Sequence, residues 1–451
     1  MLPQDDKASA PTPDSSNRAE NRMPAFVSTR LNGHYVDRVE KLWGGDHLLH
    51  GLTPGADAIH LSNNDYLCLL HEPELLKAQS RVLLGGGDIL MSGVFMHGDT
   101  PQARLEKKLA HFMGAEDGLI SQSGWCANIG LLQSIAGPDA PVYLDMMAHV
   151  SLWEGAHAAN ARSIPFMHND AVHAERQINK HGPGVIVVDS VYSINGSVCP
   201  LEAFVEVAER TGSILVVDES HSLGTHGPHG AGLVAELGLS DRVHFRTASL
   251  AKTFAGRAGF ITCSTRFKGY FFSEARPAVF SSCLLQHEIA WFDAALDFIS
   301  QADDRRALLK TQTKRVRETL TELGYNVSDG SEQIIALEAG TEPQTMVLRN
   351  ALQSRGVFGA VFCAPATPKN RSLMRLTLNS GLTDIEVDRV LEVCAEIREE
   401  VDLPNWSSSK RVRNRRMATV GQAAPMRAAP EAERIDEQPA VAAQLMSAGR
   451  D

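Results

Sequence analysis

The chain has 451 residues, of which 43% are hydrophobic and 22% are charged, and its formal net charge is −11 at pH 7. This composition is that of a globular protein large enough to divide into two or three domains. The acidic balance argues against a general nucleic-acid-binding protein, because neutralising phosphates requires a basic surface.

The cysteines and the apolar runs indicate the cellular compartment of the protein. The seven cysteines include no CxxC pair, so the sequence indicates neither a metal site nor a disulfide framework, and a reducing cytoplasm fits best. Residues 1–21 lack the apolar core of a secretion signal. We also expect no transmembrane segment, because no apolar run is long enough to span a membrane.

The first 58 residues fall into two segments. Residues 1–22 are rich in Asp, Ser, Pro and Ala, and we predict that they are disordered. Residues 23–58 are predicted to be a helical segment, because apolar residues recur at helical spacing within 31–49. A packing role for this helix, on the body of the protein or on a partner subunit, is favoured over a functional one.

Residues 59–285 are predicted to form a large domain, which begins with two segments suited to ligand contact. A short strand at 59–61 leads into a polar turn, in which Asn64 either binds a substrate carboxylate or caps the turn. The segment 83–98 is rich in glycine, which lets the backbone approach a ligand closely.

A polar turn at 122–128 separates a predicted strand at 118–121 from a helix. Ser123, Gly124 and Trp125 lie in this turn. Small residues ahead of a helix make an anion site, since free N–H groups and the helix dipole both face the turn. The pattern is compatible with a phosphate site or with a plain tight turn.

Strands and helices alternate along the rest of the large domain. The predicted strands are 142–144, 163–166, 184–188, 214–217 and 243–246. This α/β alternation implies right-handed crossovers and a mainly parallel sheet, seven-stranded in all, with helices on both faces. The last strand, 258–263, follows its predecessor too closely for a helical crossover, so we expect it to run antiparallel.

The C-terminal third changes pattern. A long helical region and two short strands, with helices after each, predict a smaller α+β domain over residues 286–404. The predicted elements are helices at 288–323, 345–354 and 384–399 and strands at 333–337 and 373–378. Residues 405–451 are predicted to be a disordered tail. Its basic run at 410–416 is interpreted as solvated rather than bound to an anionic surface.

Asp218 and Lys252 each follow a buried strand, at 214–217 and 243–246 respectively. The carboxyl ends of parallel strands share one edge, so these two side chains are predicted to line one crevice. This pair suits pyridoxal 5'-phosphate (PLP), because a lysine can bind its aldehyde and a carboxylate can keep its ring nitrogen protonated. A helix cap and a surface lysine are the alternative interpretation.

Polar groups at other strand ends converge on the same crevice. His149 follows the strand at 142–144, where its ring would stack on the pyridine. Ser193 lies in a turn after the strand at 184–188. His221 lies three residues beyond Asp218, within reach of the phenolic oxygen of PLP. A structural role is common for any one of these residues, but the ordered set favours a cofactor site.

Five motifs taken together resemble the α-oxoamine synthases. The motifs are NDYL at 64–67, SGWCAN at 123–128, HND at 168–170, DESHSLG at 218–224 and SLAK at 249–252. The resemblance covers about residues 25–400. It implies a PLP-dependent transferase of fold type I, which condenses an amino acid with an acyl-CoA and releases coenzyme A and carbon dioxide.

The resemblance also assigns roles to individual residues. Lys252 would hold PLP and later take the α-proton, Asp218 would pair with the ring nitrogen, and His221 would bond the phenolic oxygen. His149 would stack on the ring, and Ser193 would lie near it. The phosphate would be held by Ser123, Gly124, Trp125 and Ser249, with Ser281 or Ser282 from the other subunit of a homodimer whose active site lies at the interface. Arg375 would bind the amino-acid carboxylate with help from Asn64, whereas the residue pattern alone favours an ion-paired strand arginine.

Within this family, 218–234 and 247–255 are closest to the quorum-sensing autoinducer synthases, which make α-aminoketone and α-hydroxyketone signals. The segment 92–97 departs from the pattern of glycine-using members, which indicates another donor, such as S-adenosylmethionine or 2-aminobutyrate. The alternative is primary metabolism of the 8-amino-7-oxononanoate, 5-aminolevulinate, 2-amino-3-ketobutyrate or 3-ketosphinganine type. A catalytically silent partner subunit is a further alternative, against which Lys252 argues.

Overall fold

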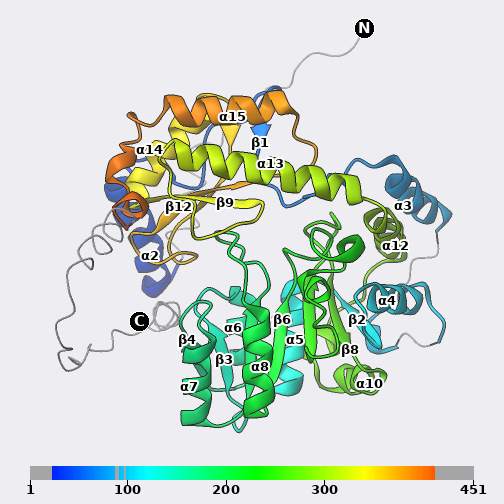
Figure 1. Ribbon diagram of the computed structural model, residues 1–451. Coiled ribbons are helices and arrows are strands. Elements are labelled where there is room, and N and C mark those ends of the chain that lie inside the picture. Colours follow the sequence, from blue (N-terminus) through cyan, green and yellow to red (C-terminus); the bar gives the residue numbers. More distant parts are fainter. Residues whose placement is uncertain (1–22, 87–90, 96–97, 412–451) are drawn as a thin grey trace, which may run out of the picture.

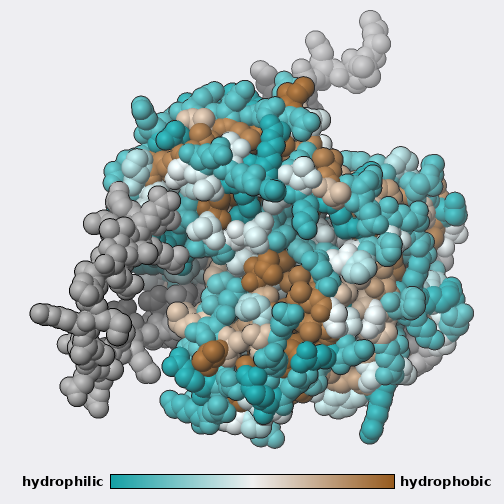
Figure 2. Space-filling view, viewed as in Figure 1, coloured by the Kyte–Doolittle hydropathy of each residue, from teal (hydrophilic) through white to brown (hydrophobic). Residues whose placement is uncertain are grey.

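The computed structural model describes residues 23–86, 91–95 and 98–411. The predictions of disorder for 1–22 and for 412–451 lie outside these residues. Figure 1 shows two parts, with the main sheet and its helices below and α13, α14 and α15 above. Figure 2 shows that this face is mostly hydrophilic, with hydrophobic residues gathered where the two parts meet. None of the described helices combines the length and apolarity needed to cross a membrane.

The large part is built on a seven-stranded sheet, as predicted. In spatial order its strands are β2 (Asp117–Ser121), β8 (Gly259–Cys263), β7 (Phe245–Ser249), β6 (Ile214–Asp218), β5 (Val185–Asp189), β3 (Val142–Asp145) and β4 (Ser163–Phe166). The pairs from β7 to β4 are parallel, whereas β8 runs antiparallel to both β2 and β7. The antiparallel prediction for 258–263 is therefore confirmed.

Both faces of this sheet are buried. Along β5, Ile186 and Val188 belong to one apolar cluster and Val185 and Val187 to another, because successive side chains point to opposite faces. The first cluster packs under α7 (Ala171–His181) and α8 (Leu201–Thr211), and the second under α5 (Gly124–Ile135), α6 (Val150–Ala158) and α10 (Thr265–Glu274). Figure 1 shows α7 and α8 on the near side of the sheet.

Further helices complete the large part. They are α3 (Pro73–Gly85), α4 (Pro101–Phe112), α9 (Leu233–Glu236) and α11 (Arg276–Val279). The predicted helix at 288–323 is two helices, α12 (Gln286–Ser300) and α13 (Asp303–Glu322). The break falls at Ala302, whose ψ of 38° is not helical. Asp303 and Asp304 then open α13, where acidic side chains favour a helix start.

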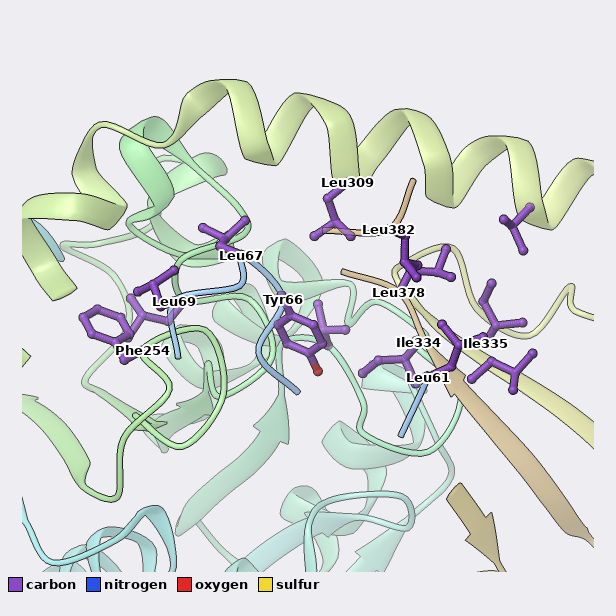
Figure 3. Packing of buried hydrophobic residues seen from close by; sticks show 14 of the residues in the cluster. Leu61, Tyr66, Leu67, Leu69, Phe254, Leu309, Ile334, Ile335, Leu378 and Leu382 are labelled. Atoms are coloured by element: carbon purple, nitrogen blue, oxygen red, sulfur yellow. The ribbon is translucent and has the colours of Figure 1, made fainter. Parts of the chain in front are cut away.

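The C-terminal part is an antiparallel sheet covered by helices. Its strands lie in the order β11 (Ala360–Phe362), β12 (Ser372–Thr377) and β9 (Ile334–Gly340), and α14 (Glu342–Gln353) and α15 (Asp384–Glu396) complete it. Figure 3 shows Leu309 of α13 pointing toward Leu378 and Leu382, above Ile334 and Ile335. One apolar cluster joins these residues to the large part, which fixes the two parts against each other.

The N-terminal segment packs on the C-terminal part. It consists of α2 (Ala25–Asn32) and a π-helical stretch (Gly33–Leu42), so the helix begins and ends earlier than the predicted 31–49. Trp43 donates from Nε1 to Glu342 Oε2 at 2.8 Å. The short strand β1 (Ile59–His60) pairs with β10 (Val357–Phe358). The predicted domain start at residue 59 therefore differs from the structure, which joins β1 to the C-terminal part.

The predicted tail also begins later than residue 405. Trp406 is 1% exposed, and its Nε1 donates to the carbonyl of Val401 at 2.7 Å. Ser408 Oγ donates to the carbonyl of Glu338 at 2.7 Å, and Arg411 forms an ion pair with the Glu338 carboxylate. Residues 405–411 are thus ordered against β9, so the prediction of disorder was wrong for this segment.

Candidate active site

A cavity of about 660 Å³ lies between the carboxyl edge of the large sheet and the C-terminal part. The loops after five strands of the large sheet, the start of α5 and several segments of the C-terminal part, among them β9 and β12, supply its walls. The predicted site residues that line it are Asn64, Gly124, Trp125, His149, Ser193, Asp218, His221, Ser249, Lys252 and Arg375. Ser123, Ser281 and Ser282 are not among the described residues that line it.

Asp218 closes β6 and is 5% exposed. Its Oδ1 accepts hydrogen bonds from the N–H and the hydroxyl of Ser220, at 2.9 and 2.5 Å, and its Oδ2 accepts from Asn128 Nδ2 at 2.8 Å. No ion pair reaches it within the described ranges. A buried carboxylate held only by neutral donors favours a cationic ligand, because burying an unpaired charge is costly.

Asp189, at the end of β5, lies in register beside Asp218. Burial raises its pKa well above the usual range, and the nearby charge of Asp218 adds to the rise. Its Oδ1 accepts from the N–H of His149 at 3.3 Å. Asp189 therefore keeps its proton to a higher pH than an ordinary aspartate does. Sequence reasoning missed Asp189, although it follows an apolar run just as Asp218 does.

His221 and Tyr66 form a short buried hydrogen bond, with 2.5 Å between His221 Nδ1 and the tyrosine hydroxyl. Burial lowers the pKa of His221 well below its usual value, and the charge of Lys252 adds to this. The imidazole is therefore neutral, and Tyr66 occupies one of its two nitrogens. Tyr66 was not predicted, although it lies inside the NDYL motif.

His149 presents a flat, neutral ring to the cavity. Its Nδ1 lies 2.7 Å from Ser151 Oγ, and the side chain caps α6. The ring is accessible from the cavity, but the protein around the cavity desolvates it and so lowers its pKa. Trp125 meets it edge-on at 6.3 Å between ring centroids. This arrangement leaves a ring face available for stacking.

The start of α5 forms the predicted anion site. Ser123 caps the helix, because its hydroxyl accepts from the N–H of Cys126 at 3.1 Å. The first N–H groups of a helix have no partner within it, so those of Gly124 and Trp125 are available to a ligand. A side chain at Gly124 would collide with Ser249, whose Cβ would lie 2.6 Å from the added carbon. Glycine therefore brings this helix start against Ser249.

Arg375 reaches the cavity from β12 and is 6% exposed. It donates to the carbonyl of Ser193 at 2.8 Å and to Asn64 Oδ1 at 3.2 Å, and it stacks on Phe362 with its Cζ 4.6 Å from the ring centroid. Its Nε is buried without a partner, and none of the described carboxylates pairs with it. The residue pattern alone favours an ion-paired arginine on a strand. Arg375 does lie on a strand, but it forms no ion pair with a described residue.

Lys252 follows β7 and faces the same cavity. Burial lowers the pKa of its amine, and the positive charge of Arg375 lowers it further, while Asp218 opposes the shift. Within the described ranges no hydrogen bond ties its Nζ. The amine is therefore accessible and more easily deprotonated than an ordinary lysine.

Ser281 and Ser282 lie away from the cavity of their own chain. Ser281 Oγ donates to the carbonyl of Pro277 at 2.5 Å, and the carbonyl of Ser282 accepts from Gln122 Nε2 at 2.9 Å. Ser282 also pairs with Ser92 in an isolated bridge. A role for either serine in this cavity would require a second copy of the chain.

The described residues fit PLP in chemistry. Asp218 is an unpaired buried carboxylate for the ring nitrogen, the start of α5 suits a phosphate, and Lys252 is an amine for the aldehyde. His149 and His221 supply a flat ring and a neutral imidazole. The cavity thus carries the parts that this cofactor requires.

Known proteins share this sequence and fold. Residues 56–393 match the aminotransferase class I and II family. The chain is 44% identical to the CAI-1 autoinducer synthase of Vibrio campbellii, over 84% of this chain and 97% of that protein. It is 30% identical to the 8-amino-7-oxononanoate synthase of Anaeromyxobacter dehalogenans, over 76% of this chain and 87% of that one.

The fold also matches a solved structure, the serine palmitoyltransferase of S. paucimobilis with a bound PLP–myriocin aldimine. The TM-score is 0.77 and the identity 22%, over 83% of this chain and 99% of that one. The match to the family covers most of the chain, including every strand of the large sheet. The chain therefore belongs to the aminotransferase class I and II family, has the fold of the fold-type I PLP-dependent transferases, and within them is an α-oxoamine synthase.

Proposed function

We propose that this protein is a PLP-dependent acyltransferase that condenses an acyl-CoA with an amino-acid-type donor. Coenzyme A and carbon dioxide leave, and the product is an α-aminoketone precursor of a quorum-sensing signal. The observation that carries the chemistry is Lys252 placed in one cavity with a buried carboxylate, Asp218, and an unpaired buried guanidinium, Arg375. The likeness to the Vibrio campbellii synthase supports the product class.

The charged residues Asp218 and Lys252 have separate roles in the chemistry. When bound, PLP supplies an electron sink for the negative charge that α-proton loss leaves on the donor. Asp218 keeps the ring nitrogen protonated, which strengthens that sink. Lys252 holds the cofactor and then, as a free amine, accepts the α-proton, a role that its lowered pKa favours.

Neutral groups position the cofactor. His149 offers its ring face, and His221, held by Tyr66, offers its remaining nitrogen to the phenolic oxygen. The N–H groups of Gly124 and Trp125 and the hydroxyl of Ser249 bind the phosphate, and Ser123 contributes by capping α5. Because the lowered pKa of each histidine favours its uncharged form, Asp218, Lys252 and Arg375 are proposed to supply the charge that the chemistry needs.

Arg375 binds the carboxylate of the amino donor. Its unpaired Nε and its neutral partners leave a guanidinium whose charge is unbalanced until an anion arrives. Asn64 assists, because its Oδ1 already holds the guanidinium in place. The α-carbon of a donor bound here comes within the same cavity as Lys252.

The protein is proposed to act as a homodimer whose active site lies at the interface. Phe95 is 67% exposed and Phe280 is 82% exposed. Both lie beside the backbone pairing of Ser92 with Ser282. Exposed aromatic side chains beside Ser282 suit a subunit interface that carries Ser281 or Ser282 to the phosphate of the other copy. We place the enzyme in the cytoplasm, in keeping with cysteines that form no disulfide.

A donor panel tests the function. The purified PLP-loaded protein is mixed with acyl-CoAs of several lengths and with S-adenosylmethionine, 2-aminobutyrate, glycine, alanine or serine, and thiol release is measured with the product mass. We expect release with S-adenosylmethionine or 2-aminobutyrate. A strong preference for glycine, alanine or serine would contradict the signalling role and favour primary metabolism, such as the 8-amino-7-oxononanoate type that the second relative represents.

A further inference from the structure

A second group of charges lines the outer end of the same cavity. It comprises Asp329, Glu338, Arg371 and Arg411, which we call the rim cluster. Arg371 precedes β12, Glu338 lies on β9, and Arg411 ends the C-terminal segment that packs against β9. The rim cluster thus depends on a stretch of chain that follows the last helix of the C-terminal part.

Two guanidiniums share one buried carboxylate in the rim cluster. Arg371 donates from Nε and Nη2 to Glu338 Oε2 at 3.1 and 2.8 Å. Arg411 donates to both oxygens of Glu338 at 2.5 and 2.9 Å, and Ser407 Oγ donates to Oε1 at 2.6 Å. Glu338 is therefore saturated with donors.

The remaining carboxylate balances this charge poorly. Asp329 Oδ2 lies 3.8 Å from each guanidinium, beyond hydrogen-bond distance, and its side chain is 40% exposed. An exposed pair at this distance contributes little. The rim cluster thus holds two arginines against one tightly bound anion.

Both arginines keep donors for a ligand. The side chain of Arg371 is 45% exposed and that of Arg411 is 33% exposed. Among the described residues, Arg371 Nη1 and Arg411 Nε have no hydrogen-bond acceptor. An arginine fork suits phosphate oxygens, because it offers parallel N–H groups with a permanent charge.

Another part of the cavity lining is apolar. Met146, Met147, Trp153 and Met167 line it, on loops and a helix of the large part. One cavity therefore joins an apolar wall, a reactive amine and a cationic rim. An acyl thioester suits such a cavity, because it combines an apolar chain, a reactive thioester and a carrier that bears phosphates.

We propose that Arg371 and Arg411 bind the phosphate groups of the thioester carrier and so select acyl-CoA over shorter thioesters. This assignment deepens the proposed function and rests on it. Glu338 and Ser407 act as positioning residues that orient the two guanidiniums. Binding of phosphate replaces the weak contact with Asp329.

Calorimetry on the PLP-loaded protein tests the assignment, with coenzyme A, dephospho-coenzyme A, 4'-phosphopantetheine and pantetheine as ligands. Arg371→Gln and Arg411→Gln should each weaken coenzyme A binding about tenfold and leave pantetheine binding unchanged. The ligand at which the loss first disappears identifies the phosphate that each arginine contacts. Arg389→Gln is the matched control, because Arg389 is 40% exposed, pairs with Glu392 and Glu396, and lies away from the cavity.

A purely structural role gives a different result. If either variant weakened pantetheine as much as coenzyme A, or if the wild-type protein bound the two equally, the assignment would be overturned. Thermal unfolding of each variant shows whether the fold is kept, and Arg411→Lys should recover part of the loss because it restores the charge. Binding does not require turnover, so a protein that binds coenzyme A through these arginines but condenses no thioester would contradict the proposed function alone.

Discussion

Two arginine sites in one cavity differ in what surrounds them. Arg375, near Lys252, has only neutral partners, and burial lowers its pKa. Arg411, at the rim, is paired with Glu338, and that hydrogen bond raises its pKa. A buried cation without a counter-ion is unfavourable until an anion binds. Arg375 is therefore suited to bind the carboxylate of the reacting amino donor. Arg411 has a structural ion pair and can bind the phosphates of the thioester carrier only with its remaining donors.

Removing Lys252 should have the largest effect. Lys252→Ala takes away both the attachment of the cofactor and the base, so turnover should fall by about 10⁴-fold or more. Thiol release under saturating acyl-CoA measures it. The exposed Lys41→Ala is the control and should keep full activity. Appreciable condensation by Lys252→Ala would contradict the roles of Lys252 as cofactor-binding residue and base.

The two neighbouring aspartates sharpen the comparison. Asp218→Asn removes a charged partner of the cofactor and should lower turnover by about 10²-fold or more. Asp189→Asn replaces a carboxyl group whose raised pKa favours the uncharged form, so its effect should be small, within about threefold. Equal losses in the two variants would contradict the assignment of Asp218, rather than Asp189, as the partner of the cofactor.

Arg375→Gln should weaken the binding of the amino donor. Losing a charged hydrogen-bond donor to the substrate carboxylate should raise the KM for that donor about 10- to 100-fold. The KM for acyl-CoA should stay nearly constant, in contrast to a rim variant. Steady-state kinetics with each substrate varied in turn distinguishes the two outcomes.

The pH dependence links Lys252 to Arg375. A nearby positive charge disfavours the protonated amine, so removing it should raise the pKa of Lys252. The rising limb of the kcat profile, which needs the free amine, should then move to higher pH in Arg375→Gln. Burial is the larger cause of the lowered pKa and remains, so the shift should be partial. An unchanged profile would argue against Lys252 as the base.

The smallest effect belongs to Ser407. Ser407→Ala removes one of several hydrogen bonds to Glu338 and should cost about 1 to 2 kcal/mol of stability at most. Denaturant unfolding measures this loss. The KM for the amino donor should not change, since Ser407 contacts Glu338 and is not among the described residues that line the cavity.

The sequence was enough to predict the strands of the large sheet in chain order and the edge of that sheet at which the cavity lies. Runs such as 214–217 are apolar throughout and end in Asp218, so local pattern alone gives both the buried strand and the polar residue at its end. The antiparallel β8 followed from a loop too short for a crossover. These features depend on neighbouring residues, which a sequence displays directly.

Other features depend on contacts between distant residues. The pairing of β1 with β10 joins two-residue strands almost 300 positions apart, and neither strand has a pattern of its own. The ordered segment at 405–411 has a single large apolar side chain, Trp406, and is otherwise held by polar contacts of Ser408 and Arg411 with the distant Glu338. Likewise Asp189 and Asp218 end similar strands, and the raised pKa of Asp189 comes from burial and nearby charge that the sequence does not display.

One measurement tests the central claim most directly, namely that Lys252 and Asp218 hold PLP in this cavity. The PLP-loaded protein is reduced with borohydride, digested, and mapped by peptide mass, while Asp218→Asn is treated in parallel. The account predicts a single pyridoxyl adduct on Lys252 and an altered cofactor absorbance in the aspartate variant. An adduct on another lysine, or no retained adduct, would contradict it.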